Sequence, residues 1–277
     1  MTRRTMQRWL TKAVVSLWLA GCVTTPDIKD LRQAEIQYDL GLNALRYGPL
    51  AEAMKSFQDA VRLYPDFPQA HHGLGLVYYT LGNHPKAMES FRKALTLKPD
   101  YSEVRNNMAR VLLSEGKYQQ AVAELRLALE NVFLPERHLA ESNLGWALFQ
   151  LGKQEEGLRL VRTALAQNEQ YCVGYEYLGM MHVARKEYTD AVVELSELTK
   201  RCPDYLIGHQ RLGQAQLLAG DGPSGCSELD FCKNQSRLSN LGMECERLFR
   251  LSCVRAAPPA AAAPAQPAPQ PAPAPRP

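Results

Sequence analysis

Seven cysteines are the residues of this 277-residue chain with the widest choice of chemistry, and they are distributed unevenly. Cys22 lies alone near the start, and no other cysteine follows until Cys172. A thiolate can accept a lipid, attack a substrate, bind a metal ion or form a disulfide, and its surroundings decide between these outcomes. No two of the cysteines have the C-x-x-C spacing typical of zinc sites and redox motifs. We therefore consider lipid attachment for Cys22 and disulfides for the other six.

Other catalytic patterns are absent from the sequence. The six histidines form no H-E-x-x-H zinc motif, and no G-x-S-x-G nucleophile elbow occurs. Gly220, Gly222 and Gly225 spell G-x-G-x-x-G, but no predicted strand precedes them, so we interpret them as part of a turn. The sequence predicts a protein that is not an enzyme and that has no cofactor, no metal site and no small-molecule substrate.

The first 21 residues have the features of an export signal. An apolar run at 13–20 is too short to span a bilayer with about 30 Å of hydrocarbon. The run ends in Leu19-Ala20-Gly21-Cys22, which resembles the lipobox of bacterial lipoproteins. That resemblance implies a signal peptide at 1–21, cleavage before Cys22 and acylation of its thiol, with palmitate among the acyl chains. The basic residues that precede the run are Arg3, Arg4, Arg8 and Lys12.

The residue after the lipid-bearing cysteine bears on the choice of membrane. In the lipoprotein family, retention in the inner membrane usually goes with Asp directly after the cysteine, whereas this chain has Val23. We expect a lipid anchor in the outer membrane, a chain that faces the periplasm, and a spacer at 22–33. An ordinary signal peptide, or a signal anchor with an unmodified cysteine, is the alternative.

The charge of the chain argues against a nucleic-acid partner, and its composition distinguishes a C-terminal tail. Without the basic leader the formal net charge changes from +3 to about −1, so electrostatics offer no case for nucleic acid. Residues 256–277 hold nine of the 18 prolines and no large apolar side chain. Such a segment cannot bury enough surface to offset the entropy of ordering, so we expect a disordered Pro/Ala-rich tail.

An internal repeat fills the middle of the chain. The steps between successive leucine-glycine-like pairs are 34, 34, 36, 34 and 34 residues. A second small residue and an apolar residue follow each pair at fixed distances, as two closely crossing helices require. The pattern over 34–239 resembles the tetratricopeptide (TPR) repeat, which implies an all-α superhelical solenoid of six helical hairpins; we expect a capping helix at 240–255. The pairs are Leu40-Gly41, Leu74-Gly75, Met108-Ala109, Leu144-Gly145, Leu178-Gly179 and Leu212-Gly213.

The resemblance to TPR proteins also implies a binding groove, lined by fixed positions of each first helix. Those positions are mainly apolar and aromatic here, which favours an amphipathic or extended polypeptide partner. The lysine and asparagine ring with which chaperone-binding TPR domains grip a terminal carboxylate is missing. Packing between repeats is the competing interpretation for several of these side chains. The expected partner-binding residues are Tyr38, Leu42, His72, Leu76, Tyr79, Asn106, Arg110, Trp146 and Phe149.

The third repeat carries a more specific resemblance. Asn106-Asn107-Met108-Ala109 is followed by Gly116-Lys117-Tyr118 and by Ala121, and two extra residues come after this unit. This arrangement is similar to the outer-membrane lipoprotein pilotins of the type IV pilus secretin, the family of PilF, PilW and Tgl. The resemblance implies a protein that binds secretin subunits, escorts them to the outer membrane and promotes their multimerisation, so that pili assemble and twitching motility is possible.

Two other functions are compatible with the same sequence. A TPR scaffold lipoprotein of another envelope complex, such as a tight-adherence pilus or the cell-wall synthesis machinery, would share nearly all of these features. A periplasmic enzyme with TPR repeats would need a second domain, and no residues are left to form one.

The six later cysteines can be paired from the expected hairpins. Export would place them in an oxidising compartment, where an even number of cysteines indicates disulfides. Cys172 opens the first helix of the fifth unit and Cys202 ends its second helix, so antiparallel packing brings the two together. Around a turn near residue 239, the sixth unit and the capping helix would be joined twice. The expected pairs there are Cys232 with Cys245 and Cys226 with Cys253.

Overall fold

The computed structural model describes residues 28–254, and within them every regular element is an α-helix. The predicted signal peptide, the lipid site at Cys22 and the Pro/Ala-rich tail lie outside the described residues. No helix within the described range is long and apolar enough to cross a membrane. The helices are α1 (Ile28–Tyr47), α2 (Leu50–Leu63), α3 (Pro68–Thr80), α4 (His84–Leu97), α5 (Ser102–Ser114), α6 (Tyr118–Leu129), α7 (Arg137–Gln150), α8 (Gln154–Gln167), α9 (Cys172–Ala184), α10 (Tyr188–Arg201), α11 (Leu206–Leu218), α12 (Gly222–Gln235) and α13 (Asn240–Ser252).

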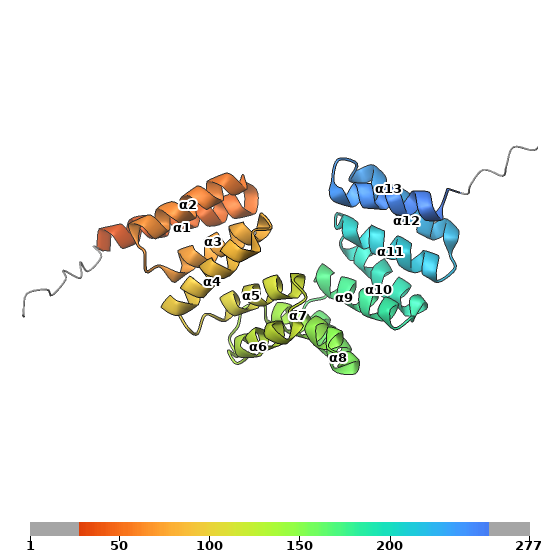
Figure 1. The fold of residues 1–277 in the computed structure, drawn as a ribbon, viewed down its shortest axis with the longest axis horizontal. Coiled ribbons are helices and arrows are strands. Elements are labelled where there is room, and N and C mark those ends of the chain that lie inside the picture. The colour runs from red at the N-terminus through yellow and green to blue at the C-terminus, as the bar shows by residue number, and fades with distance from the viewer. Residues whose placement is uncertain (1–27, 255–277) are drawn as a thin grey trace, which may run out of the picture. The chain divides into compact units, whose positions relative to one another are not determined.

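The helices belong to two compact bodies. The first comprises the described residues up to Val104, and the second begins at Arg105, so the division falls within α5. In the first body α1 packs on α2, α2 on α3 and α3 on α4. In the second body each helix from α6 to α13 packs on the next along the chain, as the neighbouring ribbons in Figure 1 show. The predicted all-α solenoid of helical hairpins with a capping helix is confirmed.

Small residues let the two helices of a hairpin cross closely, and the fourth hairpin shows why. A Cβ built on Gly157 of α8 would lie 2.5 Å from the carbonyl oxygen of Gly145 on α7. The reverse construction, a Cβ on Gly145, would meet the carbonyl oxygen of Gly157 at 2.7 Å. Both distances are shorter than any real Cβ contact, so only glycine fits at this crossing. The recurring small residues of the sequence therefore set the spacing between the helices.

The turns inside the second to sixth hairpins each contain a residue in a left-handed backbone conformation. Gly152 adopts it with φ of 84°, and glycine bears no steric penalty there. The fifth hairpin is different, because Lys186 holds the same turn position with φ of 63°. A side chain in that region costs about 1 kcal/mol or more, so the surrounding contacts of this turn must hold it in place.

The two extra residues after the third unit form an exposed loop between α6 and α7. Val132 and Phe133 are 74% and 88% exposed, whereas the adjacent Leu134 is buried. Arg137, at the start of α7, donates hydrogen bonds to the carbonyl oxygens of Leu129 and Asn131 and so closes the loop. The insertion thus lengthens a surface connection without interrupting the helical hairpins.

Disulfides close the fifth hairpin and join the sixth hairpin to the capping helix. One joins the start of α9 to the end of α10, and two join α12 to α13 and the residue after it. The six cysteines have the same pairing as the sequence analysis expects. The bonds are Cys172–Cys202, Cys226–Cys253 and Cys232–Cys245.

Candidate functional site

In the first body, the predicted groove residues of α1 differ in exposure. Tyr38 is half-buried, and its ring centroid lies 5.8 Å from that of Phe57 and 5.5 Å from that of Phe67. Leu42, one turn further along α1, is 37% exposed. Tyr38 therefore joins α1 to the next two helices as well as offering an edge to solvent, whereas Leu42 is available for contact.

The side chains of α3 form an aromatic group with the start of the next repeat. The His72 ring lies 5.2 Å from the Tyr101 ring in an edge-to-face arrangement, and Nδ1 of His72 lies 3.3 Å from the Tyr101 hydroxyl. Burial lowers the pKa of His72 to about 4, so the imidazole is neutral at physiological pH. Burial also raises the pKa of the Tyr101 phenol. This part of the surface is thus uncharged and aromatic.

Two further predicted residues lie on the same helix. Leu76 and Tyr79 are both half-buried, and the Tyr79 ring stacks on His84 with centroids 5.9 Å apart. A hollow of about 600 Å³ elsewhere in this body lies between α1 and α2. Polar residues such as Gln37, Asn43 and Asp59 line it. Its polar lining does not match the apolar partner expected from the sequence.

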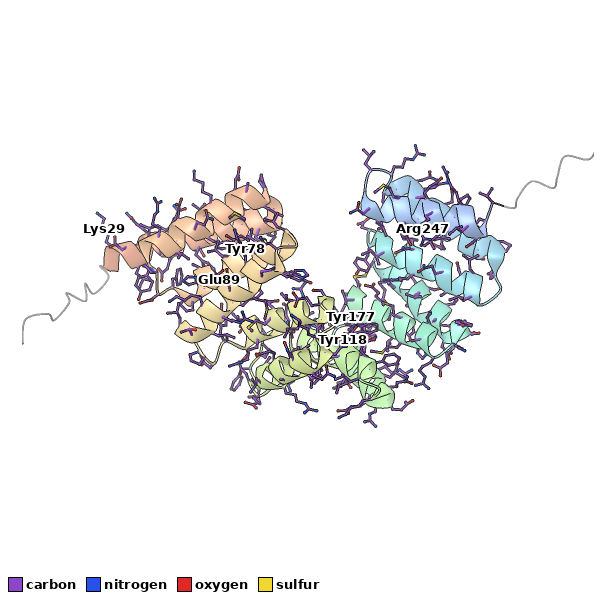
Figure 2. All side chains as sticks on the ribbon, in the orientation of Figure 1. Lys29, Tyr78, Glu89, Tyr118, Tyr177 and Arg247 are labelled. Atoms are coloured by element: carbon purple, nitrogen blue, oxygen red, sulfur yellow. A yellow bond between two sulfur atoms is a disulfide. The ribbon has the colours of Figure 1, made fainter. Side chains whose placement is uncertain are left out.

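In the second body, Trp146 of α7 is the centre of an aromatic stack. Its ring is nearly parallel to that of Tyr177 on α9, labelled in Figure 2, with the centroids 5.0 Å apart. On its own helix it also stacks on Phe149 at 6.3 Å. Phe149 is only 5% exposed and belongs to the hydrophobic core. The structure therefore corrects the assignment of Phe149 from partner contact to core residue.

The Asn106 side chain is also internal. It is 8% exposed, and its Oδ1 accepts a hydrogen bond of 3.0 Å from Nδ2 of Asn143. The Tyr177 hydroxyl donates to Oδ1 of Asn143 at 3.3 Å, so the three side chains tie α5, α7 and α9 together. The asparagine at 106 thus has a structural role rather than the predicted partner contact. Arg110, one turn later, is exposed and donates to Oδ1 of Asn107.

A largely apolar cavity of about 500 Å³ lies beside this stack. Its walls come from α7, α9, α10, α11 and α13, all in the second body. Arg211, Gln214 and Ser252 supply the polar part of the lining. A concave, apolar surface with few polar groups is the usual form of a binding site. The main apolar contributors are Trp146, Met180, Val183, Leu217, Leu218 and Leu248.

Arg211 places one positive charge at this cavity. Its Nε lies 3.6 Å from the carboxylate of Glu176, which is 9% exposed. The Tyr205 hydroxyl donates to the other oxygen of that carboxylate at 2.6 Å. Burial and the Glu176 carboxylate together raise the pKa of Tyr205, so the phenol stays protonated. The Arg211 guanidinium thus lies beside a buried carboxylate at the wall of the cavity.

Most residues of this cavity are missing from the sequence prediction, although the repeat register could have found them. Trp146, Met180 and Gln214 are separated by 34 residues each and hold the same position in successive first helices. The same register relates Val183 to Leu217. Trp146 is itself a predicted groove residue, and extending this register to the last repeat would have added Gln214 and Leu217. Leu248 lies on the capping helix, outside the repeat, where the register gives no signal.

Comparisons with known proteins agree with the fold. Three tetratricopeptide-repeat family models match residues 38–102, 80–140 and 138–163. A comparison with curated proteins by sequence gave no match. Among solved structures, PilW, described as a widely conserved type IV pilus biogenesis factor, aligns with a TM-score of 0.66 at 20% identity. That alignment covers 76% of this chain and 97% of PilW.

Two further structures show how widely the fold is shared. PilF of Pseudomonas aeruginosa aligns with a TM-score of 0.61 at 20% identity, over 79% of this chain and 99% of that one. The Cut9–Hcn1 hetero-tetramer of the APC/C aligns with a TM-score of 0.68 at 16% identity, over 78% of this chain and 42% of that one. The chain therefore contains tetratricopeptide repeats, and its fold is similar to that of two type IV pilus proteins.

Proposed function

We propose that this chain is an outer-membrane lipoprotein pilotin, which binds secretin subunits of the type IV pilus and promotes their targeting and multimerisation. The observation that carries the proposal is the likeness to PilW and PilF, which extends over 97% and 99% of those two chains. The Leu19-Ala20-Gly21-Cys22 motif supports the lipid anchor, because two or more acyl chains hold a protein stably at a membrane. The anchor would keep the repeats where secretins assemble.

The apolar cavity of the second body is the part of the surface that we assign to the secretin. Buried aromatic side chains tend to contribute most of the binding energy at interfaces, and Trp146 lies at this cavity. Arg211 would orient the bound segment through a carboxylate or a carbonyl oxygen. The exposed Leu42 and the half-buried Tyr79 of the first body stay candidates for further contacts.

A clean deletion tests the biological role. In a cell without a paralogue, loss of the protein should leave secretin monomers in place of heat-resistant multimers, and no surface pili. Immunoblots of unboiled envelopes and a count of piliated cells measure both effects. Normal secretin rings and pili in the deletion strain would rule out the pilotin function and favour a scaffold of another envelope complex.

A point variant tests the cavity itself. Leu218 lines the cavity and is 50% exposed, so Leu218→Arg places a charge there without disturbing the core. The matched control is Leu127→Arg on α6, where the leucine is 42% exposed and is not among the cavity residues. We expect only the Leu218 variant to lose secretin multimers while both variants are exported and folded. Equal levels of secretin multimers in the two variants would show that the secretin does not bind at this cavity.

Binding can also be followed directly, because Trp146 is the single tryptophan after residue 22. Titration of the purified mature chain with the secretin's soluble periplasmic domains should change the tryptophan emission and saturate. A variant secretin fragment without tryptophan gives a clean signal. The Leu127→Arg protein should behave as the wild type, and the Leu218→Arg protein should give no saturable change.

A further inference from the structure

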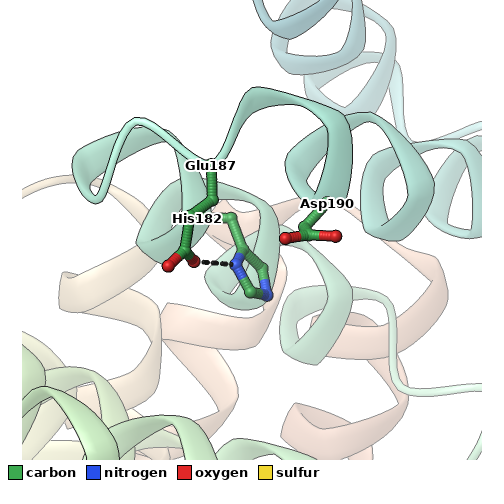
Figure 3. Close-up of side chains that lie close together, drawn as sticks. All are labelled: His182, Glu187 and Asp190. Carbon is green, nitrogen blue, oxygen red and sulfur yellow. Dashed lines mark hydrogen bonds and ion pairs between the residues drawn. The ribbon is translucent and has the colours of Figure 1, made fainter.

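The turn between α9 and α10 brings together three side chains of the kinds that bind metal ions. His182 is 5% exposed, and its Nδ1 lies 2.7 Å from Oε2 of Glu187. Figure 3 shows the carboxylates of Glu187 and Asp190 on two sides of the imidazole ring. One ligand atom from each of the three residues lies within 4.8 Å of the other two. The cluster combines a nitrogen ligand with two oxygen ligands.

This combination is not a general feature of the repeat. The same three positions lie 34 residues earlier and later in the two flanking hairpins, where they hold no histidine and only one carboxylate each. In the fifth hairpin the histidine replaces a core or amide side chain, and acidic residues hold both other positions. The corresponding sets are Leu148, Lys153 and Glu156 in the fourth repeat and Gln216, Asp221 and Ser224 in the sixth.

Glu187 also differs from its counterpart in the sixth hairpin. It is the N-cap residue of α10, yet its side chain makes no capping hydrogen bond. In the sixth hairpin Asp221, at the same position, caps α12 by accepting a hydrogen bond from the Ser224 backbone N–H. The Glu187 carboxylate turns to His182 instead, and Nε of Arg185 donates to its other oxygen at 2.8 Å. Oε1 of Glu187 thus accepts a hydrogen bond from Arg185, which is not a member of the cluster, while Oε2 faces His182.

That arrangement matches the way in which ligating carboxylates are held in metal sites. Ligands are oriented by a second set of hydrogen bonds, a role that Arg185 fills for Glu187. Ligand atoms around a tetrahedral Zn²⁺ are separated by about 3.4 Å, because Zn–N and Zn–O bonds measure about 2.0–2.2 Å. The separations in the cluster are all within 4.8 Å, so they exceed what a bound ion requires by at most about 1.4 Å. Asp190 is exposed and can close that gap by rotation about its side-chain bonds.

We propose that His182, Glu187 and Asp190 bind one divalent transition-metal ion, for which Zn²⁺ is the best match. An imidazole nitrogen favours Zn²⁺ over the hard ions Mg²⁺ and Ca²⁺, which prefer oxygen ligands alone. The two carboxylates balance the charge of the ion, and water completes a tetrahedral set. The ion would join the last turn of α9 to the first turn of α10, in the hairpin whose turn holds Lys186 at positive φ.

Calorimetric titration of the mature chain with zinc chloride tests this site. The protein carries no histidine tag and keeps its disulfides, so that neither a tag nor free thiols compete for the ion. We expect one Zn²⁺ per chain and a rise in melting temperature on saturation. Asp190→Asn, which changes an exposed side chain, should lower the affinity at least about tenfold. His182→Ala should abolish binding, and Co²⁺ should give a visible d–d absorption band that His182→Ala removes.

The matched control is the His209–Glu228 pair. Nδ1 of His209 lies 2.6 Å from Oε2 of Glu228, but no third ligand joins this pair within the described part of the chain. His209→Ala should therefore leave the stoichiometry and affinity unchanged. The proposal is overturned if the wild-type chain shows no saturable Zn²⁺ binding, or if Asp190→Asn binds the ion as tightly as the wild type does.

Discussion

Replacing Gly157 with alanine tests whether the crossing of α7 and α8 sets the geometry of the fourth hairpin. The new Cβ would lie 2.5 Å from the Gly145 carbonyl oxygen and 2.9 Å from Cβ of Phe149. Ordinary van der Waals contact begins at 3.4 Å. Because the carbonyl belongs to the backbone of α7, it cannot rotate away. The two helices must therefore separate by about 0.9 Å at this point.

The expected loss of stability follows from two opposing contributions. Overpacking of a core costs about 1–3 kcal/mol, and the upper end applies here because the clash is with a backbone atom. Alanine is a better helix former than glycine by about 1 kcal/mol, which offsets part of that cost. We expect a net destabilisation of about 2 kcal/mol. For a body of this size, that corresponds to a fall in melting temperature of roughly 4–8 °C.

Thermal unfolding of the oxidised protein, followed by far-ultraviolet circular dichroism, measures the effect. Gly222→Ala is the matched control, since Gly222 is also helical and a Cβ there meets nothing within 4 Å. We expect the control to stay within about 0.5 kcal/mol of the wild type. If Gly157→Ala melts at the same temperature as Gly222→Ala, the close crossing does not set the hairpin geometry and the reasoning is refuted.

Three further predictions concern titration, oxidation and anchoring. The pKa of His72 is about 4 in the folded chain and 6.5 in the unfolded chain. Between these two pH values the unfolded chain binds a proton at His72 that the folded chain does not bind, so the free energy of unfolding falls as the pH is lowered. Urea unfolding should thus show a loss of about 2 kcal/mol between pH 8 and pH 5, and His72→Gln should remove it. Unfolded, unreduced mature protein should contain no reactive thiols. The double change of Cys172 and Cys202 to Ser should lower the unfolding free energy by about 3–4 kcal/mol, and six reactive thiols in the wild type would contradict the pairing. Cys22→Ala should give uncut or soluble protein in membrane fractionation, whereas a fully processed outer-membrane form would exclude the lipobox.

The fold could be predicted from the sequence because its determinants are local and repeated. Every hairpin needs small residues where its two helices cross, as Gly145 and Gly157 are in the fourth hairpin. The regular interval between these small residues is therefore enough to identify the helices. The cysteine pairs follow from the same periodicity, since antiparallel helices bring the start of one to the end of the next.

The candidate site was less predictable, because exposure depends on contacts between repeats. Asn106 and Phe149 occupy groove positions of the repeat, yet the structure places them in the interior. Asn106 meets a polar partner 37 residues away, and no local pattern indicates that contact. The cavity needs the capping helix, where Leu248 has no equivalent in the repeat. The His182 cluster uses a spacing that corresponds to no known metal motif, so only the turn geometry shows it.

The positions of the disulfides have a consequence for the order in which the chain matures. The bonded cysteines are separated by 30, 27 and 13 residues, so no bond reaches back to an early repeat. In a chain that emerges from a translocation channel with its N-terminus first, Cys202 meets Cys172 before any later thiol has appeared. An acylated Cys22 would offer no competing thiol at that moment.

The last two bonds are nested, and here helix formation directs the pairing. Cys226 and Cys232 emerge together and could react with each other in an extended chain. Once α12 has formed, six residues at about 1.5 Å rise separate their Cα atoms by about 9 Å, beyond the roughly 7 Å that a disulfide allows. Each thiol can then react only with a cysteine of α13 or of the residue after it, and Cys245 emerges before Cys253. In such an exported chain, early formation of α12 would exclude a bond between Cys226 and Cys232 and so favour the bonds that the structure shows.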